Sequence, residues 1–261
     1  MGLDKYVSWE QFEKKIYYPF PTDPDWEKDP AGLVRFYEDP EANPLPTPTG
    51  KLEFYSERLA KNFPGDKERP PVPHWVEKGA GHDERLTSER AKNYPLLITS
   101  CHPRWRVHSQ CDDMKWCREI ETCKIKGPDG YGYQTMWINP LDAAKRNIRH
   151  GDVAEILNER GRVLAGAYVT ERIMPGAVYI DHGARLDPIV TGKIDRGGDI
   201  NTIVPEKRMS KHATGMVVSG FLVEVKRADL DKLTREYPEA FARPYDSGSG
   251  LRFDRLLEAG K

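Results

Sequence analysis

The prolines of this chain are unevenly distributed, and this limits what its first third can fold into. Thirteen of the 21 prolines lie within residues 1–95. Proline lacks a backbone N–H and clashes with the preceding helical turn, so long helices are excluded there. The segment also offers few periodic apolar faces of its own. We therefore expect residues 1–93 to form an extended, proline-rich arm that packs over a neighbouring surface.

Two short helices are expected within this arm. Ser8 suits the N-cap of a helix over residues 8–15, because its side chain can accept from a backbone N–H of the first turn. A second helix is expected over residues 56–61, directly after the strand-like residues 52–55. The rest of the arm is expected to be extended.

From Tyr94 onward, short β-type runs alternate with turn residues, a pattern typical of an all-β barrel or sandwich. Residues 153–157 and 163–169 flank a turn, so we expect a hairpin in which Gly161 adopts a positive φ. The other expected strands are 96–99, 133–138, 178–180 and 221–225.

Further elements are expected around these strands. Asn139 should cap a short helix with Pro140 at its first position and Asp142 in its first turn, where a fixed φ and a negative charge are favourable. A polar helix is expected over residues 228–237, and a flexible linker over 246–250.

The overall charge and hydropathy exclude several kinds of partner. The formal net charge is −1, which argues against nucleic acid or an anionic membrane as the main partner. The amino-terminal residues lack the apolar core of a signal peptide, and we expect no membrane span. The sequence therefore predicts a cytoplasmic location.

Neither the cysteine spacing nor any common catalytic motif indicates that this chain carries out a reaction by itself. Cys101, Cys111, Cys117 and Cys123 contain no C-x-x-C pair, so reduced thiols are expected rather than a metal site. The sequence has no P-loop, G-x-G-x-x-G or G-x-S-x-G motif. Cys101 and His102 are adjacent, and adjacent side chains on a strand point apart. We predict no catalytic residue and no metal ligand.

Two segments are candidates for binding a polar ligand. The loop 99–110 is rich in donors, since an arginine fork can hold two phosphate or carbonyl oxygens and Ser or Gln can pair with an amide-like edge. A solvated polar loop is the alternative. Gly197 and Gly198 could let the backbone pass close to a ligand, although such a pair often marks a simple turn.

The motifs occur in an order that resembles the C-terminal portion of the molybdopterin oxidoreductases of the dimethyl sulfoxide reductase superfamily. The resemblance covers about residues 44–227. It rests on Pro46–Ser56, Asn139-Pro-Leu-Asp-Ala, Gly151-Asp152, Asn158-Glu-Arg-Gly and Val169-Thr170. Within the superfamily, His102-Pro-Arg, Ile138–Ala143 and Asp195–Asn201 are most similar to the large subunits of the pyrogallol-phloroglucinol transhydroxylase branch.

The resemblance implies a fold that is mainly β with short helices. Residues 94–227 would form a six-stranded double-psi β-barrel that binds a molybdopterin dinucleotide. The extended arm 1–93 would precede it and pack on the catalytic portion, and residues 228–261 would form a C-terminal helix and surface tail.

The resemblance also implies a function and partners. The chain would be the cofactor-binding subunit or fragment of a molybdenum or tungsten oxidoreductase or hydroxytransferase, with polyhydroxylated aromatics as one class of substrate. It would share bis(molybdopterin guanine dinucleotide) with a separate chain that carries the catalytic N-terminal portion. An iron–sulfur electron-transfer subunit is a further expected partner. A complete family member has several hundred residues before this region, including the metal ligand.

The resemblance implies that the cofactor is held by polar side chains from four segments. Arginine and lysine suit its phosphates, and a carboxylate such as Asp142 could accept from guanine N–H donors, while a cap role for Asn139 and Asp142 is equally compatible. The expected binding residues are Thr99, His102, Arg104, Arg106, His108, Ser109, Gln110, Asn139, Asp142, Asp199, Asn201 and Lys211.

Two alternatives stay open at this point. The barrel could be a non-catalytic module that binds a cofactor or a protein partner. It could also resemble the self-cleaving aspartate-decarboxylase barrels, but those cleave at a Gly-Ser bond inside the barrel. Here Gly248-Ser249 lies in the tail, which argues against this alternative.

Overall fold

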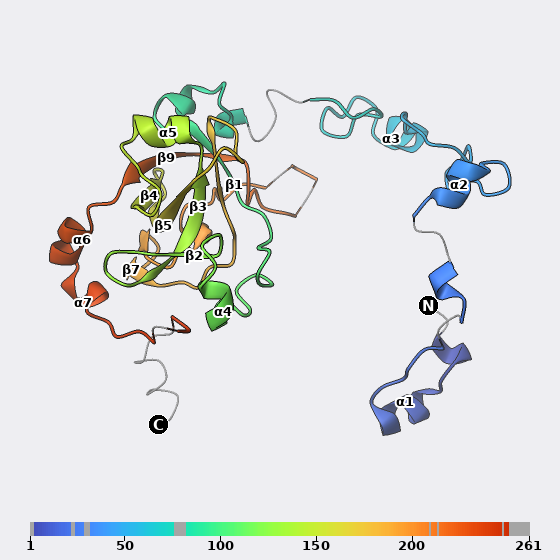
Figure 1. Cartoon of the computed structure of the whole chain (residues 1–261). Helices are drawn as coiled ribbons and strands as arrows, with labels where there is room; N and C mark the ends of the chain where they lie inside the picture. The colour runs from blue at the N-terminus through green and yellow to red at the C-terminus, as the bar shows by residue number, and fades with distance from the viewer. Residues whose placement is uncertain are drawn as a thin grey trace. The chain divides into compact units, whose positions relative to one another are not determined.

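The structure is a computed structural model of the 261-residue chain. It describes residues 3–21, 24–28, 32–75, 82–208, 210–212, 214–246 and 248–250. The chain forms two compact units, Met1–Trp75 and Val76–Lys261 (Figure 1). No helix in these described ranges is long and apolar enough to cross a membrane.

The first unit consists of short helices joined by extended chain. Its α-helices are α1 (Trp9–Lys15), α2 (Val34–Glu38) and α3 (Glu57–Asn62), and its 3-10 turns are η1 (Leu3–Lys5) and η2 (Trp26–Lys28). Ser8 and Gln11 form a capping box, because each side chain accepts from the other residue's backbone N–H, at 3.3 and 3.1 Å. Ser56 caps α3. Both expected helices are confirmed, but the expected strand at 52–55 is wrong.

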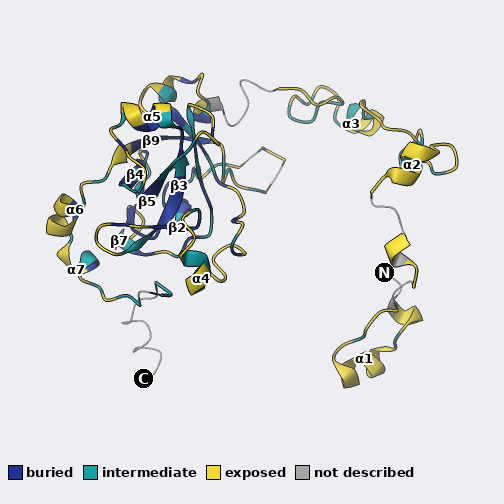
Figure 2. Cartoon of the chain, viewed as in Figure 1, coloured by how far each residue is buried: buried dark blue, intermediate teal, exposed yellow. Residues whose placement is uncertain are grey.

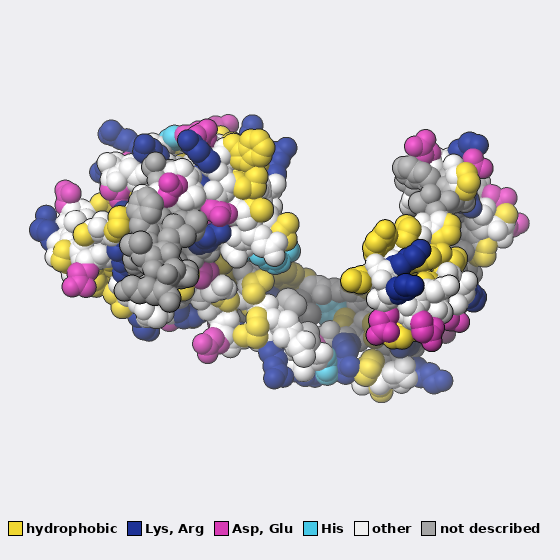
Figure 3. Space-filling view, turned by 90° about the horizontal axis from the view of Figure 1, so that it is seen from below, with side chains coloured by type: hydrophobic (Ala, Val, Ile, Leu, Met, Phe, Trp, Pro, Cys, Tyr) yellow, Lys and Arg dark blue, Asp and Glu magenta, His cyan; other side chains and the backbone are white. Residues whose placement is uncertain are grey.

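The first unit has no hydrophobic core of its own. None of its described residues is fully buried, and its ribbon is coloured as exposed or intermediate in Figure 2. Large apolar side chains point outward instead: Trp9, Ile16, Tyr37, Phe54 and Trp75 are 70–90% exposed. Hydrophobic side chains are visible on its surface in Figure 3. So much exposed aromatic surface is typical of a segment that packs against a partner.

Six strands of the second unit close into a barrel. They are β1 (Leu96–Thr99), β3 (Gly132–Ile138), β4 (Val153–Leu157), β5 (Arg162–Val169), β6 (Ala177–Ile180) and β9 (Phe221–Arg227). Their order is β3-β6-β1-β9-β4-β5, and a second pairing of β3 with β5 closes the ring. The predicted fold, mainly β with a closed six-stranded barrel, is confirmed.

The barrel has the internal symmetry of a double-psi connection. Two neighbouring pairs are parallel, β1 with β6 and β3 with β5, and the other pairs are antiparallel. In chain order, β1, β3 and β4 form the first half of the barrel, and β5, β6 and β9 form the second. If each strand of one half is replaced by the corresponding strand of the other, the same neighbouring pairs result. The parallel pair β1–β6 then coincides with the parallel pair β3–β5.

Short elements extend this framework. Strand β2 (Lys124–Lys126) pairs with β3, while β8 (Ile194–Asp195) pairs in parallel with β5 and antiparallel with β7 (Pro188–Val190). The helices are α4 (Lys115–Arg118), α5 (Pro140–Lys145), α6 (Leu230–Glu236) and α7 (Pro238–Phe241). The 3-10 turns are η3 (His82–Glu84), η4 (Glu89–Lys92) and η5 (Ile200–Thr202). The sequence analysis did not find β2, β7 or β8, which are too short to show a period.

The barrel interior is filled by side chains from every strand. Ile98, Met136, Ile156, Ile180 and Phe221 are all completely buried and belong to one cluster. The barrel is therefore a packed core, and any ligand must bind at its loops.

Three local expectations need correction. Gly161 does not have a positive φ; a Cβ there would lie 2.8 Å from the Lys193 carbonyl oxygen, so close approach of the chain requires glycine. Residues 246 and 248–250, within the expected linker, are not free, because the Asp246 carboxylate accepts from the backbone N–H groups of Gly248 and Ser249. Residues 82–93, expected in the arm, belong to the second unit, where the Glu84 carboxylate accepts from the Leu222 N–H of β9.

Replacing a core residue of the barrel tests this packing. We expect Ile156→Ala to lower the free energy of unfolding by about 2–5 kcal/mol, because it removes buried methyl groups and leaves a cavity. Met174→Ala is the control, since Met174 is 72% exposed and should change stability by less than about 0.5 kcal/mol. Urea unfolding measures both, and equal effects of the two variants would contradict the assigned core.

Candidate functional site

The parallel strand pair β1–β6 determines where the polar loops meet. Parallel strands end at the same edge of a sheet, so the loops after Thr99 and after Ile180 emerge side by side. The segment after β8 joins them there. Together these loops line a cavity of about 700 Å³, which we call the loop pocket, with residues from 102–112, 182–187 and 197–201. A volume of this size suits a small-molecule ligand or one part of a larger cofactor.

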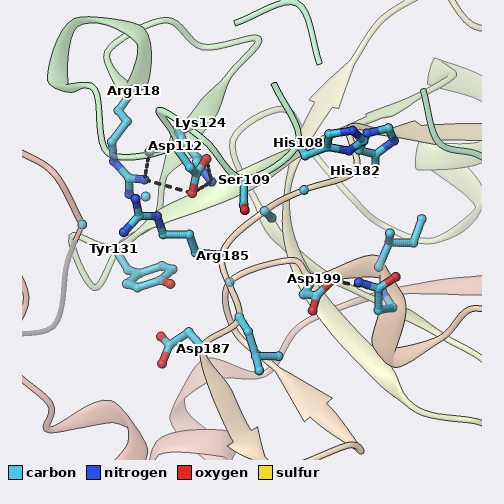
Figure 4. Close-up of a pocket in the computed structure, with 18 of the residues that line it drawn as sticks. His108, Ser109, Asp112, Arg118, Lys124, Tyr131, His182, Arg185, Asp187 and Asp199 are labelled. Atoms are coloured by element: carbon cyan, nitrogen blue, oxygen red, sulfur yellow. Dashed lines mark hydrogen bonds and ion pairs between the residues drawn. The ribbon is translucent and has the colours of Figure 1, made fainter. Parts of the chain in front are cut away.

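Three imidazoles converge at one end of the loop pocket. The ring centroids of His102, His108 and His182 lie 4.5–5.0 Å apart. His108 and His182 are stacked, as Figure 4 shows. Burial lowers the pKa of His182, and the two neighbouring rings and Arg106 lower it further. Its Nε2 atom is buried and has no hydrogen-bond partner among the described residues. His182 therefore offers a neutral ring nitrogen to a bound group, beside two further imidazoles.

These imidazoles could also hold a metal ion. One ligand nitrogen from each of the three residues lies within 4.8 Å of the others, and this is the one such group found in the described part of the chain. It includes none of the four cysteines, all of which are free thiols. His102 and His108 were predicted as binding residues but not as metal ligands, because His182 lies up to 80 residues away in the chain.

The loop that carries His108 passes so close to residue 183 that only glycine fits at that position. His108 has a φ of 53°, and a Cβ on Gly183 would lie only 2.2 Å from the His108 carbonyl carbon. Arg106 fixes the same loop from below: its side chain donates to the carbonyl oxygens of His108 and His182 and to Gln134 Oε1, at 2.9–3.1 Å. The loop is thus preorganised by buried contacts.

A buried network of charges forms another wall of the loop pocket. Asp112 Oδ1 lies 3.1 Å from both Arg106 NH1 and Lys124 Nζ, and Asp112 Oδ2 lies 3.6 Å from Arg118 NH1. The pKa of Lys124 is lowered to about 8, first because of burial and then because of Arg118 and Arg106, while Asp112 opposes the shift. Asp112, Arg118 and Lys124 were not predicted from the sequence, since the short strand β2 and helix α4 give no periodic signal.

Carboxylates line the opposite side of the loop pocket, across from these cations in Figure 4. Asp195 is buried and accepts from the backbone N–H groups of Asp187 and Asp199, at 2.7 and 2.8 Å, so it holds both pocket residues in place. Burial raises the pKa of Asp195 to about 6, and it also raises the pKa of Asp199. The pocket therefore has one basic wall and one acidic wall.

The structure brings together part of the predicted binding set. His102, His108, Ser109, Asp199 and Asn201 all line the loop pocket. Thr99 and Arg104 line a neighbouring cavity of about 530 Å³. Gln110, later in the same loop as Arg104, is exposed to solvent, and its backbone pairs with that of Val107. Arg106 is buried under the loop rather than presented to the pocket.

Three other predicted residues lie elsewhere. Asn139 caps α5 and donates to the Ile173 carbonyl at 2.7 Å. Asp142 accepts from the Gly176 N–H at 2.6 Å and lines a separate cavity. Asn139 is thus the cap of α5, and Asp142, in the first turn of the helix, joins it to the loop at Gly176. Lys211 is exposed and outside the loop pocket. A ligand-binding role for these three stays a prediction.

The Gly197-Gly198 pair serves the protein's own packing. A Cβ on Gly197 would lie 2.0 Å from the Arg185 carbonyl oxygen, and one on Gly198 would lie 2.5 Å from Gln134 Cβ. The two glycines let this segment cross β3 and the 181–187 loop closely. That approach places Asp199 and Asn201 at the pocket.

A closed double-psi barrel with a polar pocket at its loops defines a cofactor-binding domain. Residues 96–218 match the Molydopterin dinucleotide binding domain family, and the barrel belongs to that family. The resemblance seen in the sequence is confirmed, and it favours cofactor binding over a module that binds only a protein partner.

The relatives are molybdoenzymes of the dimethyl sulfoxide reductase family. The chain is 35% identical over 258 residues to the pyrogallol hydroxytransferase large subunit of Pelobacter acidigallici, covering 88% of this chain and 28% of that protein. It is 37% identical over 235 residues to dimethyl sulfoxide reductase DmsA of Escherichia coli (strain K12), covering 87% and 26%. The chain thus spans about a quarter of the length of these curated relatives. Acetylene hydratase from Pelobacter acetylenicus aligns in structure at 18% identity with a TM-score of 0.47, over 86% of this chain and 28% of that one.

Asp195→Asn tests the support of the acidic wall. An amide has one oxygen in place of two, so one of the two backbone N–H groups loses its acceptor. We expect the free energy of unfolding to fall by about 1–3 kcal/mol, the cost of a buried unsatisfied donor. Asp199→Asn is the control, because an amide oxygen can still accept from the Asn201 N–H. Indistinguishable urea midpoints for the two variants would refute the assigned role of Asp195.

The lowered pKa of Lys124 predicts a pH dependence of stability. Between pH 8 and 10.5 the unfolded chain keeps this proton and the folded chain has lost it, so the free energy of unfolding gains a rising contribution with pH. Lys124→Met should lack this contribution, and Lys126→Met, an exposed neighbour on β2, should retain it. Urea unfolding across this pH range measures the difference. Parallel curves for wild type and Lys124→Met would contradict the prediction.

Proposed function

We propose that this chain is the cofactor-binding portion of a molybdenum or tungsten enzyme that uses bis(molybdopterin guanine dinucleotide). The observation that carries the proposal is the loop pocket, with its basic and acidic walls, on a barrel of the molydopterin dinucleotide binding family. The cofactor has anionic phosphates and heteroaromatic rings with N–H donors. Cations, carboxylates and the unpartnered His182 nitrogen are suited to these groups.

In this proposal the chain binds and orients the cofactor, and the catalytic residues lie elsewhere. His108, Ser109 and Asn201 would supply hydrogen bonds to a pterin ring, while the buried Arg106 keeps the loop rigid. When bound, the cofactor supplies the metal centre that carries out electron or group transfer.

The proposed partner is a separate chain that carries the catalytic portion of the enzyme. The exposed apolar side chains of the first unit support this, because they have no core to enter within the unit. Residues 1–75 would cover that catalytic portion. We further propose an iron–sulfur electron-transfer subunit as a second partner. We also propose a cytoplasmic location, since the four cysteines are free thiols, as is usual for proteins of a reducing compartment.

The proposed reaction follows the relative that is named a hydroxytransferase. On that basis the substrate is a polyhydroxylated aromatic compound, and the reaction moves a hydroxyl group. Oxygen-atom transfer on another small molecule is the alternative, since other relatives are named dimethyl sulfoxide reductases. Product analysis with phenolic and sulfoxide substrates distinguishes the two.

Native purification tests the central proposal. The chain should copurify with a larger partner, with molybdenum or tungsten and with two guanine-dinucleotide pterins for each metal. Metal analysis and pterin quantification on the same sample give the result. Recovery of the chain in a stable complex without pterin or metal would refute the proposal.

The double variant His108→Ala/Ser109→Ala tests the role of the loop. We expect the retained pterin content to fall about tenfold or more, because two polar contacts to the ring are lost. Val107→Ala is the matched control in the same loop, since its side chain is 61% exposed and apolar. Equal pterin content in the two variants would show that the loop does not bind the cofactor.

A further inference from the structure

One end of the loop pocket carries an excess of buried positive charge. Arg106, Lys124 and Arg118 surround the single carboxylate of Asp112, and the four side chains are only 1–12% exposed. The four groups together have a net charge of +2. Burying unpaired charge is costly, so a group of this kind is stabilised by an anion.

Hydrogen-bond donors remain available in this cluster. Lys124 donates to Asp112 and to Gln134 Oε1, which leaves one of its three N–H groups. Arg118 NH1 donates to the Asp112 carbonyl oxygen, but its Nε and NH2 have no hydrogen bond among the described residues. Gly132 and Gly250 lie against this guanidinium: a Cβ on them would come within 3.1 and 2.2 Å of NH2. The absence of side chains there lets the backbone of both residues lie close to the guanidinium.

Arg118 and Lys124 lie where two cavities join. Both residues line the loop pocket and also a second cavity of about 830 Å³, together with Tyr131 and Tyr245. The histidines lie at the loop-pocket end. The second cavity is lined by Phe241, Arg243 and Arg196, and the guanidinium of Arg196 lies over the rings of Tyr131 and Phe241 at 4.2 and 4.6 Å. An anion at the junction would therefore have, on each side, a cavity that could hold a heteroaromatic ring.

The carboxylates across the pocket reinforce this placement. Asp187 and Asp199 face the basic cluster in Figure 4 and would repel an anion from their own side. Asp187 is already paired with Arg243 and with the Tyr245 hydroxyl. The basic end is thus the favourable position for a phosphate within the pocket.

From this arrangement we infer that Arg118 and Lys124 form a diphosphate-binding site at the junction of the two cavities. The inference rests on the proposed function and deepens it, because it assigns positions to the parts of the dinucleotide. The diphosphate lies on Arg118 and Lys124, the pterin extends towards His108 and His182, and the nucleoside occupies the second cavity. Arg106 acts from beneath by holding Asp112 and the loop.

The site has a consequence for pH dependence. The pKa of Lys124 of about 8 means that the free site loses a positive charge as pH rises through this value, so diphosphate affinity should fall there. The charged and titratable groups around Lys124 are Asp112 and Arg106 from the loop, Arg118 from α4, Cys123 before β2 and Asp181 after β6. Burial raises the pKa of both Cys123 and Asp181, so Cys123 also stays neutral at pH 8.

Calorimetric titration of the full chain at pH 7 tests the site directly. The probes are inorganic diphosphate, GDP and guanosine. We expect diphosphate to bind and GDP to bind more tightly, because its nucleoside also contacts the second cavity. Arg118→Gln and Lys124→Met should each weaken diphosphate binding by about tenfold or more, the loss of one charge-assisted contact. Lys126→Met should bind as wild type does.

Three outcomes would overturn the inference. They are no diphosphate binding up to about 10 mM, far above the range of a site for a tightly held cofactor; unchanged binding in both Arg118→Gln and Lys124→Met; or equal losses in Lys126→Met. Circular dichroism and the Arg118→Gln variant guard against misfolding, since Arg118 lies at the edge of the buried network.

A second measurement separates the cofactor from a free nucleotide as the source of the diphosphate. In the purified complex, Arg118→Gln should lower the content of dinucleotide pterin relative to Lys126→Met. Diphosphate binding without any pterin in the wild-type complex would refute the proposed function but leave a nucleotide site. Full pterin retention in Arg118→Gln would refute the assignment of this site to the cofactor.

Discussion

The parallel pairing of β1 with β6 is the constraint on which the rest of the site depends. Because these strands run in the same direction, the loops after Thr99 and Ile180 leave the barrel together and face each other. Residues 60–80 positions apart in the chain thereby become neighbours, such as His102 and His182 at 4.5 Å between ring centroids. The second parallel pair, β3 with β5, closes the barrel.

Buried polar groups make the loop pocket both costly and specific. Arg106 is almost fully buried, yet its side chain holds two carbonyl oxygens and Gln134 rather than a ligand. Asp195 likewise uses both carboxylate oxygens to hold the backbone at Asp187 and Asp199. Such groups stabilise one loop conformation, because any other conformation would leave them without partners. The shape of the surface that remains for a ligand is therefore determined by buried residues that do not contact the ligand.

Much of the fold could be predicted from the sequence, because its signals are local. Asn139 with Pro140 marks the start of α5, Ser8 marks α1, and the apolar runs of β1 and β9 mark buried strands. The site was predictable in the donor-rich loop, at His102, His108 and Ser109, and after the Gly197-Gly198 pair, where Asp199 and Asn201 lie. Lys124 and Asp112 escaped prediction because their importance arises from contact across 12 residues and from burial, which no periodic pattern encodes.

The first unit has apolar side chains without a core, and the second has positive charge without enough counter-charge. One explanation accounts for both features. The first unit exposes Trp9, Ile16 and Tyr37 with no core to bury them, while the second has a complete core but a buried cluster with excess positive charge at one end of its pocket. Apolar exposure is relieved by a protein surface, and excess positive charge is relieved by an anion. A partner chain that also holds the dinucleotide would satisfy both requirements at once. Cofactor binding and association with the catalytic portion should therefore be coupled, with each increasing the affinity of this chain for the other.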